Sequence, residues 1–284
     1  MTYHTDFFQN PNDFLARTLT DLAKDETRNN LLLGLALRLK ENLHAYGEGD
    51  PLMVVVTDSV GKNAAMAVMT PPFPMIVNSD SVNEEALTAL MEALISENWQ
   101  LPGVNGVAEV SDTYARIWQA RTGKSARLHM RLRAYELHEV INLDFPEGAM
   151  RIADEKDAQL TADLLNAMRA ELMLQGDTPT PESVLQIIRM KRVFFWDTTE
   201  KVVCITIANR PQIKGICVSG VYTPPEFRRM GYARALVAEV SREMLSRGFE
   251  LTNLFTDLAN PTSNKIYQEV GYKPVCDYHQ YQFK

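Results

Sequence analysis

The residues with the clearest chemical potential lie in one segment, where an apolar run of β type leads into an amphipathic helix. The segment has the pattern Arg228-x-x-Gly231-x-Ala233, with small residues where the helix is expected to begin. The first turn of a helix has backbone N–H groups without intrahelical partners and a partial positive charge, so anions bind there. Gly231 lets an anion approach without a Cβ in the way. With the charges of Arg228, Arg229 and Arg234 around it, this segment predicts a pyrophosphate site.

A second informative segment lies further along the chain. Residues 251–256 form an apolar run, Asn260 then precedes a proline, and the next helix carries Tyr267 before a Gly-Tyr pair. Asparagine is a preferred N-cap and proline suits the first helical position, so a helix is expected to begin here. The two segments, in this order, resemble motifs A and B of the GCN5-related N-acetyltransferases (GNAT). The resemblance covers residues 150–284.

This resemblance implies an α+β fold, with a mixed, mostly antiparallel sheet between helices, and a binding site for coenzyme A. In this family the strand of motif A separates from its neighbour, and the pantetheine arm pairs with the exposed main chain as an added strand would. Residues 216–221 are expected to offer that main chain. The residues expected to contact the cofactor are Val221, Tyr222, Thr223, Arg228, Arg229, Met230, Gly231, Tyr232, Ala233, Arg234, Asn260, Ser263 and Asn264.

The same resemblance makes Tyr267 the candidate proton donor to the thiolate that leaves during acetyl transfer. A phenol has a reference pKa of about 10 and can protonate a forming thiolate. The alternative is an ordinary core tyrosine whose hydroxyl is hydrogen-bonded within the protein. Asn260 also has two interpretations, an N-cap alone or an N-cap that binds the cofactor arm as well. A solvated helix start explains Ser263 and Asn264 equally well.

A general base is harder to identify, because residues 213–221 contain no Asp or Glu. Many GNAT proteins have a glutamate on this strand. Glu171, near the end of a predicted helix beside the acceptor cleft, is the candidate that acts through water, and a plain solvent-facing carboxylate is the alternative. Glu226 stands too close to the phosphate end. Cys217 is a candidate nucleophile, but the resemblance implies direct transfer and favours a buried structural thiol.

The chain contains two similar hairpin patterns about half its length apart, each with a short polar turn ending in lysine. Their apolar runs are residues 53–56 with 64–69, and residues 193–196 with 202–207. This offset predicts two copies of one supersecondary plan, although any two hairpins look alike. The N-terminal half lacks the Arg-x-x-Gly-x-Ala pattern, so it is interpreted as a degenerate GNAT-like domain that does not bind coenzyme A. We expect this domain at residues 1–145 and a catalytic GNAT domain at residues 146–284.

Composition excludes several other classes of protein. The chain has 284 residues, 45% of them apolar, and a formal charge of −7 without a basic run, which argues against nucleic-acid binding. The acidic balance fits a cationic substrate, although solubility alone explains it. Three cysteines without close spacing and five scattered histidines favour neither a disulfide framework nor a metal site. No apolar run predicts a signal or a membrane segment, so we expect a soluble, cytoplasmic protein.

These expectations combine into one leading function. It is an acetyl-CoA-dependent N-acetyltransferase that transfers the acetyl group directly to an amine of a small molecule or a protein, as a monomer or homodimer and without a metal. A coenzyme A-binding sensor or interaction module without turnover is the alternative, and a different acyl donor is a third possibility. The acceptor is not predicted, because variable helices and the N-terminal half form that surface.

Overall fold

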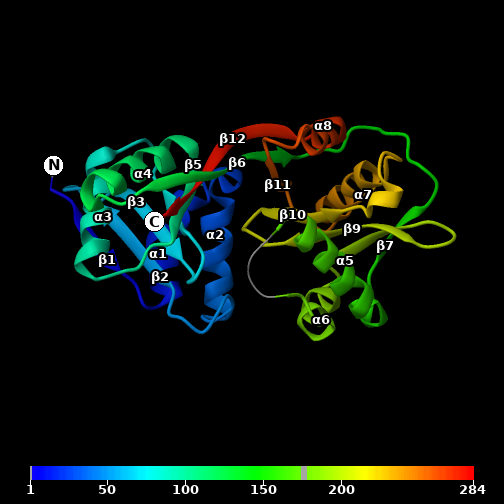
Figure 1. Ribbon diagram of the computed structural model, residues 1–284, viewed down its shortest axis with the longest axis horizontal. Coiled ribbons are helices and arrows are strands. Elements are labelled where there is room, and N and C mark those ends of the chain that lie inside the picture. The colour runs from blue at the N-terminus through cyan, green and yellow to red at the C-terminus, as the bar shows by residue number, and fades with distance from the viewer. Residues whose placement is uncertain (1, 174–177) are drawn as a thin grey trace. The chain divides into compact units, whose positions relative to one another are not determined.

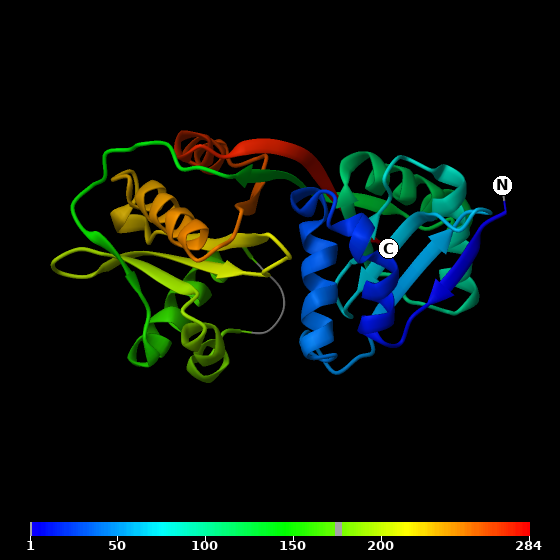
Figure 2. The same cartoon turned by 180° about the vertical axis from the view of Figure 1, so that it is seen from behind.

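The computed structural model describes residues 2–173 and 178–284 and divides into two compact units. Unit 1 contains Met1–Ala134, Thr256–Ala259 and Pro274–Lys284, and unit 2 contains Tyr135–Phe255 and Asn260–Lys273. Figure 1 labels the elements and Figure 2 shows the opposite side.

Unit 1 is built on a sheet with the strand order β1-β2-β3-β4-β5-β12. Its strands are β1 (His4–Phe7), β2 (Leu52–Thr57), β3 (Asn63–Met69), β4 (Met75–Asn78), β5 (Gly103–Val107) and β12 (Lys273–Phe283). The β4–β5 pair is parallel, whereas β5 pairs antiparallel with β12. Its helices are α1 (Pro11–Leu22), α2 (Glu26–Glu41), α3 (Glu84–Ser96) and α4 (Ala108–Thr122).

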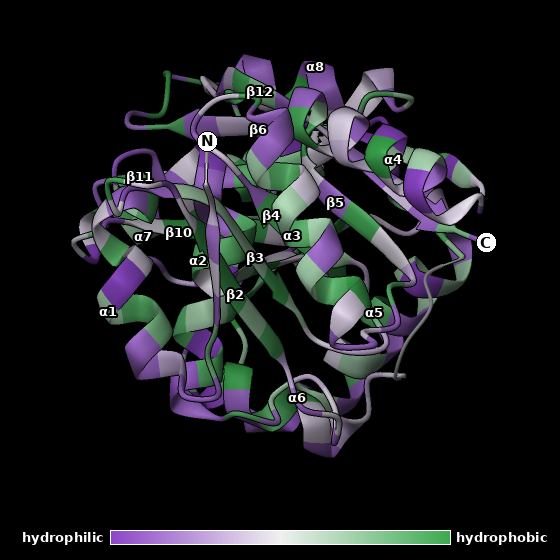
Figure 3. Ribbon diagram, turned by 90° about the vertical axis from the view of Figure 1, so that its left-hand side faces the viewer, coloured by the Kyte–Doolittle hydropathy of each residue, from purple (hydrophilic) through white to green (hydrophobic). Residues whose placement is uncertain are grey.

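The core of unit 1 follows the alternation of side chains along β2. Met53 and Val55 lie in one hydrophobic cluster with α1 and α2, represented by Phe14 and Leu33. The intervening β2 residues are also buried, which explains why the strand is a continuous apolar run (Figure 3). The hairpin predicted from the apolar runs at residues 53–56 and 64–69 is confirmed, because β2 and β3 pair antiparallel.

Unit 2 has a sheet with the strand order β11-β10-β9-β8-β7. Its strands are β7 (Ala149–Ile152), β8 (Val193–Asp197), β9 (Val202–Asn209), β10 (Gly215–Tyr222) and β11 (Leu251–Asp257). Its helices are α5 (Ala158–Glu171), α6 (Pro181–Arg189), α7 (Tyr232–Ser246) and α8 (Pro261–Val270). One hydrophobic cluster joins this sheet to α5 and α6, and another joins it to α7. The predicted mixed sheet flanked by helices is confirmed.

The order of elements repeats along the chain. The run β1, α1, α2, β2, β3, β4, α3, β5, α4 and β6 (Ala126–Leu137) has its counterpart in β7, α5, α6, β8, β9, β10, α7, β11, α8 and β12. The parallel pair β4–β5 corresponds to the parallel pair β10–β11. The two predicted copies of one plan are thus visible in the topology.

The single predicted boundary near residue 145 does not describe the units completely. The last strand of the second copy, β12, pairs with β5 of the first, with Tyr278 opposite Val107 and Gln282 opposite Gly103. Residues 274–284 therefore belong to unit 1, because their main-chain hydrogen bonds are made there. The assignment of a degenerate and a catalytic domain to the two halves remains a prediction.

No helix in the described part of the chain is both long and apolar enough to cross a membrane.

Candidate functional site

The predicted anion site lies at the start of α7. Gly231 is the N-cap residue, and no side chain caps this helix end. The first intrahelical hydrogen bond runs from the Ala235 N–H to the Gly231 carbonyl, at 3.0 Å. The N–H groups of Tyr232, Ala233 and Arg234 precede that bond and have no intrahelical partners. These free N–H groups are the ones on which the predicted anion site depends, and the site itself stays a prediction.

The conformation of this turn explains its glycine. Gly231 has φ +85°, a left-handed conformation that residues with a Cβ rarely adopt. A Cβ added there would approach no protein atom closer than 3.9 Å. Backbone conformation, rather than crowding by the protein, therefore requires glycine here. Arg229 also has a positive φ, of 65°, so the turn is strained just before the helix.

The three arginines around the turn differ in their partners. Arg228 donates from Nε to the Thr223 carbonyl at 2.9 Å and from Nη2 to Glu171 Oε2 at 2.5 Å. Arg234 contacts Glu269 Oε2 at 3.4 Å. Arg229 is exposed and forms no ion pair among the described residues. The positive charge expected at this site is therefore partly neutralised, and Arg229 is the unpaired cation.

The strand of motif A separates from its neighbour as expected. The register between β10 and β11 runs only from Gly215 opposite Leu251 to Cys217 opposite Asn253, although both strands continue further. We call the point beyond this last pair the fork. Main-chain groups of β10 past Cys217 are not paired with β11, so they are available to an added strand-like ligand.

Strand β10 contains a bulge that was not predicted from the sequence. Ser219 and Tyr222 are opposite Ile207 and Ile205 of β9, so β10 contains one extra residue in this interval. Gly220 adopts φ +62° within the bulge. A glycine inside a strand is a known signal for a bulge, and it could have identified this one.

The side chains that follow the fork are mostly structural. Tyr222 is buried in the cluster with α5 and α6, and its ring lies 5.8 Å from the Arg228 guanidinium. Val221 packs in the apolar clusters around α7. The Thr223 hydroxyl donates to the Cys204 sulfur at 3.2 Å. The Tyr222 side chain is therefore enclosed by the protein, whereas Val221 is only partly buried. Met230 is exposed.

Tyr267 differs from the two tyrosines packed beside it. The Tyr135 hydroxyl donates to Asn264 Oδ1 at 3.1 Å, and that of Tyr272 bonds Ser241 and Thr252 at 2.9 and 2.8 Å. The Tyr267 hydroxyl has no hydrogen-bond partner among the described residues, although the residue is only 8% exposed. The alternative of a core tyrosine with a satisfied hydroxyl does not describe this arrangement.

The environment of Tyr267 keeps it protonated. Burial raises its pKa above the ordinary value, and the nearby Tyr272, Cys204 and Cys217 raise it further. The phenol therefore retains a proton that it can donate. Tyr267 belongs to the hydrophobic cluster against which Val221 packs, and Val221 lies on β10 past the fork.

The start of α8 shows how the other motif B residues are used. Asn260 is the N-cap, and its Oδ1 accepts from the Ser263 N–H at 3.1 Å. Asn264 donates from Nδ2 to the Asn260 carbonyl at 2.7 Å and accepts from the Tyr135 hydroxyl. The capping role of Asn260 is confirmed. The amide of Asn264 is occupied by bonds within the protein.

The candidate base and the candidate nucleophile both have structural surroundings. Glu171 ends α5 and forms the ion pair with Arg228, so it lies at the phosphate end of the site. Glu171, like Glu226, is therefore too close to the phosphate end to be a good candidate for the base. Cys217 is completely buried, as expected for a structural thiol, and Arg210 Nη2 lies 2.9 Å from its sulfur. Burial raises the pKa of the Cys204 thiol, which accepts from Thr223, to about 12.

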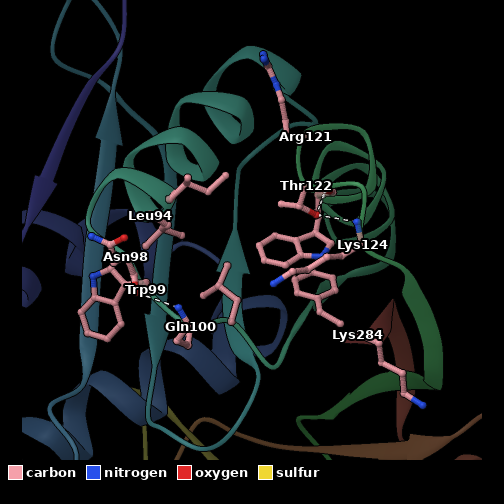
Figure 4. Close-up of a pocket in the computed structure, with 12 residues that line it drawn as sticks. Leu94, Asn98, Trp99, Gln100, Arg121, Thr122, Lys124 and Lys284 are labelled. Carbon is pink, nitrogen blue, oxygen red and sulfur yellow. Dashed lines mark hydrogen bonds between the residues drawn. The ribbon is translucent and has the colours of Figure 1, made fainter.

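A cavity of unit 1 does not involve the predicted residues. It has a volume of about 520 Å³ and lies between the ends of α3, α4 and β12 (Figure 4). In Figure 4, Trp99 and Gln100 lie on one side of it and Thr122 and Lys124 on the other. Every predicted site residue belongs to unit 2.

Comparisons with known proteins agree with this fold. Residues 202–281 match the family of FR47-like proteins. No curated protein matches the sequence. A GCN5-related N-acetyltransferase from Sphaerobacter thermophilus is 16% identical with a TM-score of 0.67, over 99% of this chain and 95% of that one.

Two other solved structures extend the similarity. A GNAT-family acetyltransferase from Colwellia psychrerythraea is 13% identical with a TM-score of 0.59, over 99% of this chain and 100% of that one. A tandem GNAT protein from the clavulanic acid biosynthesis pathway is 12% identical with a TM-score of 0.58, over 99% and 98%. The chain therefore has the GNAT fold, which confirms the fold that the two motifs implied.

Proposed function

We propose that the chain is an acetyl-CoA-dependent N-acetyltransferase whose cofactor site lies in unit 2. The observation that carries the proposal is the Tyr267 hydroxyl, which has no hydrogen-bond partner among the described residues although the side chain is only 8% exposed. Tyr267 belongs to the hydrophobic cluster against which Val221 of β10, past the fork, packs. A thiolate leaving at the fork would supply the missing partner. The similarity in fold to GNAT acetyltransferases supports the same conclusion.

Each part of the site has a role in this proposal. The uncapped start of α7 and the unpaired Arg229 bind the pyrophosphate. Main-chain groups of β10 beyond Cys217 bind the pantetheine arm. Asn260 fixes the start of α8, which in turn holds Tyr267. This placement of two substrates in one geometry contributes up to roughly 7–11 kcal/mol to lowering the barrier.

The transfer exchanges one bond for another. A protonated alkylamine, with a pKa of about 10.4, first loses a proton to become nucleophilic. Its nitrogen attacks the thioester carbonyl carbon, so that a C–N bond forms as the C–S bond breaks. The nitrogen loses a second proton to water, and Tyr267 protonates the departing sulfur and is then reprotonated by solvent. The products are an amide and a free thiol.

A coenzyme A-binding module without turnover is the second candidate. It is favoured by the absence of a carboxylate on β10 and by the pairing of Glu171 with Arg228. Under both functions the protein binds coenzyme A, so binding alone does not separate them.

The discriminating experiment measures free thiol release from acetyl-CoA with a panel of small amines and lysine-containing peptides. The proposal predicts acceptor-dependent release that Tyr267→Phe strongly reduces. Stoichiometric binding of coenzyme A without thiol release from any acceptor would instead support the binding module.

A further inference from the structure

A row of polar side chains crosses the sheet of unit 2 at the fork. Asn209 of β9 is opposite Cys217 of β10, which in turn is opposite Asn253 of β11. Residues paired across strands share one face of a sheet. Along β9 this is also the face of Ile205 and Ile207, which pack with α5 and α6. The row is therefore a polar interruption in an otherwise apolar face.

The hydrogen bonds around this row determine how its amides are oriented. Gln212 donates from Nε2 to the Arg210 carbonyl at 2.8 Å, and a carbonyl can only accept. Gln212 Oε1 is thus the acceptor for Asn253 Nδ2, also at 2.8 Å. Asn253 Oδ1 is left without a donor, although this residue is completely buried, and Asn209 Oδ1 is also buried and unpartnered. The two strands on either side of β10 thus each hold one unsatisfied acceptor.

Arg210 supplies a charge without a counter-ion beside this row. Its Nη2 donates to the Cys217 sulfur, and its Nε is buried without an acceptor. No carboxylate among the described residues forms an ion pair with it, whereas Arg228 is paired with Glu171. Arg210 also has φ +45°, an uncommon conformation for a residue with a side chain. Strained, partly buried charges without partners are characteristic of ligand sites.

We propose that this row binds the acceptor, and that the acceptor is an amine carrying a carboxylate, as an amino acid does. This inference rests on the proposed acetyltransferase function. Arg210 binds the carboxylate through its unpaired guanidinium N–H groups. Asn209 and Asn253 accept the two N–H groups of the neutral amine. The nitrogen lone pair remains free to attack the thioester at the fork.

The test compares acceptors that differ only in the carboxylate. Phenylalanine with phenethylamine, and leucine with isopentylamine, are two such pairs. We expect kcat/KM for thiol release to be at least about tenfold higher for the carboxylated member of a preferred pair, which corresponds to about 1.4 kcal/mol. Arg210→Gln should raise the KM for that acceptor about tenfold or more and leave the KM for acetyl-CoA unchanged. Arg189→Gln, which removes an exposed ion pair between Arg189 of α6 and Glu155, is the matched control and should change neither.

A binding measurement decides the inference independently of turnover. Calorimetry of the amino acid with the coenzyme A-bound protein should show binding that Arg210→Gln weakens about tenfold and Arg210→Lys weakens less. Thiol release from simple amines together with no carboxylate preference and no effect of Arg210→Gln would overturn the inference and leave the proposed function standing. The row would then hold a structural water only. Coenzyme A binding without thiol release would count against the proposed function, and the calorimetry would still show whether the row binds carboxylated amines.

Discussion

At the scale of single residues, Tyr267 makes the clearest prediction. Tyr267→Phe removes a donor used mainly as negative charge develops on sulfur, and its ring still packs between Tyr135 and Tyr272. We expect kcat to fall roughly 10²–10⁴-fold with little change in the KM for acetyl-CoA. Steady-state kinetics with a working acceptor tests this, and a variant with near wild-type kcat would leave solvent as the proton source.

Tyr272→Phe is the matched control for that variant. The Tyr272 hydroxyl is bonded to Ser241 and Thr252, so its removal leaves two buried hydroxyls short of a partner. It should lower the free energy of unfolding by about 1–3 kcal/mol and affect kcat far less.

The raised pKa of Tyr267 also predicts how kcat depends on pH, because the phenol stays protonated above its ordinary range. Wild-type kcat should therefore show no loss from Tyr267 ionisation up to about pH 10.

Gly231 allows a similarly controlled test of the anion site. Gly231→Val places a Cβ and a strained backbone where the pyrophosphate is expected, so coenzyme A should bind roughly tenfold or more weakly, a loss of about 1.4 kcal/mol. Gly248, after the other end of α7, also has a positive φ and no atom near its missing Cβ. Gly248→Val should lower the free energy of unfolding and leave the affinity for coenzyme A, measured by calorimetry, unchanged. Equal losses of affinity in the two variants would move the site elsewhere.

At the scale of elements, the ion pair between α5 and the turn before α7 decides the role of Glu171. The pair is about two-fifths exposed on each side, and exposed pairs contribute about 0–1 kcal/mol. Glu171→Gln frees Arg228 for a phosphate, so coenzyme A should bind up to about fivefold more tightly at low salt. The kcat should be nearly unchanged, as measured with saturating substrates. A large loss of kcat would restore Glu171 as the base.

The elements show what could be predicted from sequence. The start of α8 could be predicted because its N-cap depends only on Asn260, the proline that follows it and the N–H group of Ser263. The helix start at Gly231 could be predicted from sequence for the same reason, because it too depends on residues close together in the chain. The pairing of Glu171 with Arg228 and of Arg210 with Cys217 was not, because each joins segments brought together only by the folded sheet and helices.

The separation of β10 and β11 stands between these cases. The family resemblance predicted it, yet nothing in the residue pattern states that pairing ends at Cys217. The bulge could have been predicted from Gly220, a glycine inside a strand, but the alternation of side chains along the strand does not reveal it. The polar row at the fork has no signal in the sequence, because Asn209, Cys217 and Asn253 become neighbours only through the register of the strands.

At the scale of the whole molecule, the two copies differ at the corresponding helix start. Helix α3 in unit 1 takes the place of α7, but the Asn83 side chain caps it and Glu84 and Glu85 open its first turn. A satisfied and negatively charged helix start repels a phosphate. We therefore expect one coenzyme A per chain, measured by calorimetry. A stoichiometry near two would contradict the interpretation of the first copy as degenerate.

The pairing of β12 with β5 also has a mechanical consequence. Strands β1 and β12, near the two ends of the described chain, are both part of unit 1, whereas unit 2 is formed by chain between residues 135 and 273. Tension applied between residues 3 and 284 is therefore first carried by the sheet of unit 1. Unit 2 is loaded only after β12 has peeled from β5 and β6. A pulled molecule should therefore lose strand pairing in unit 1 before unit 2, which holds the proposed acetyl-transfer site, begins to unfold.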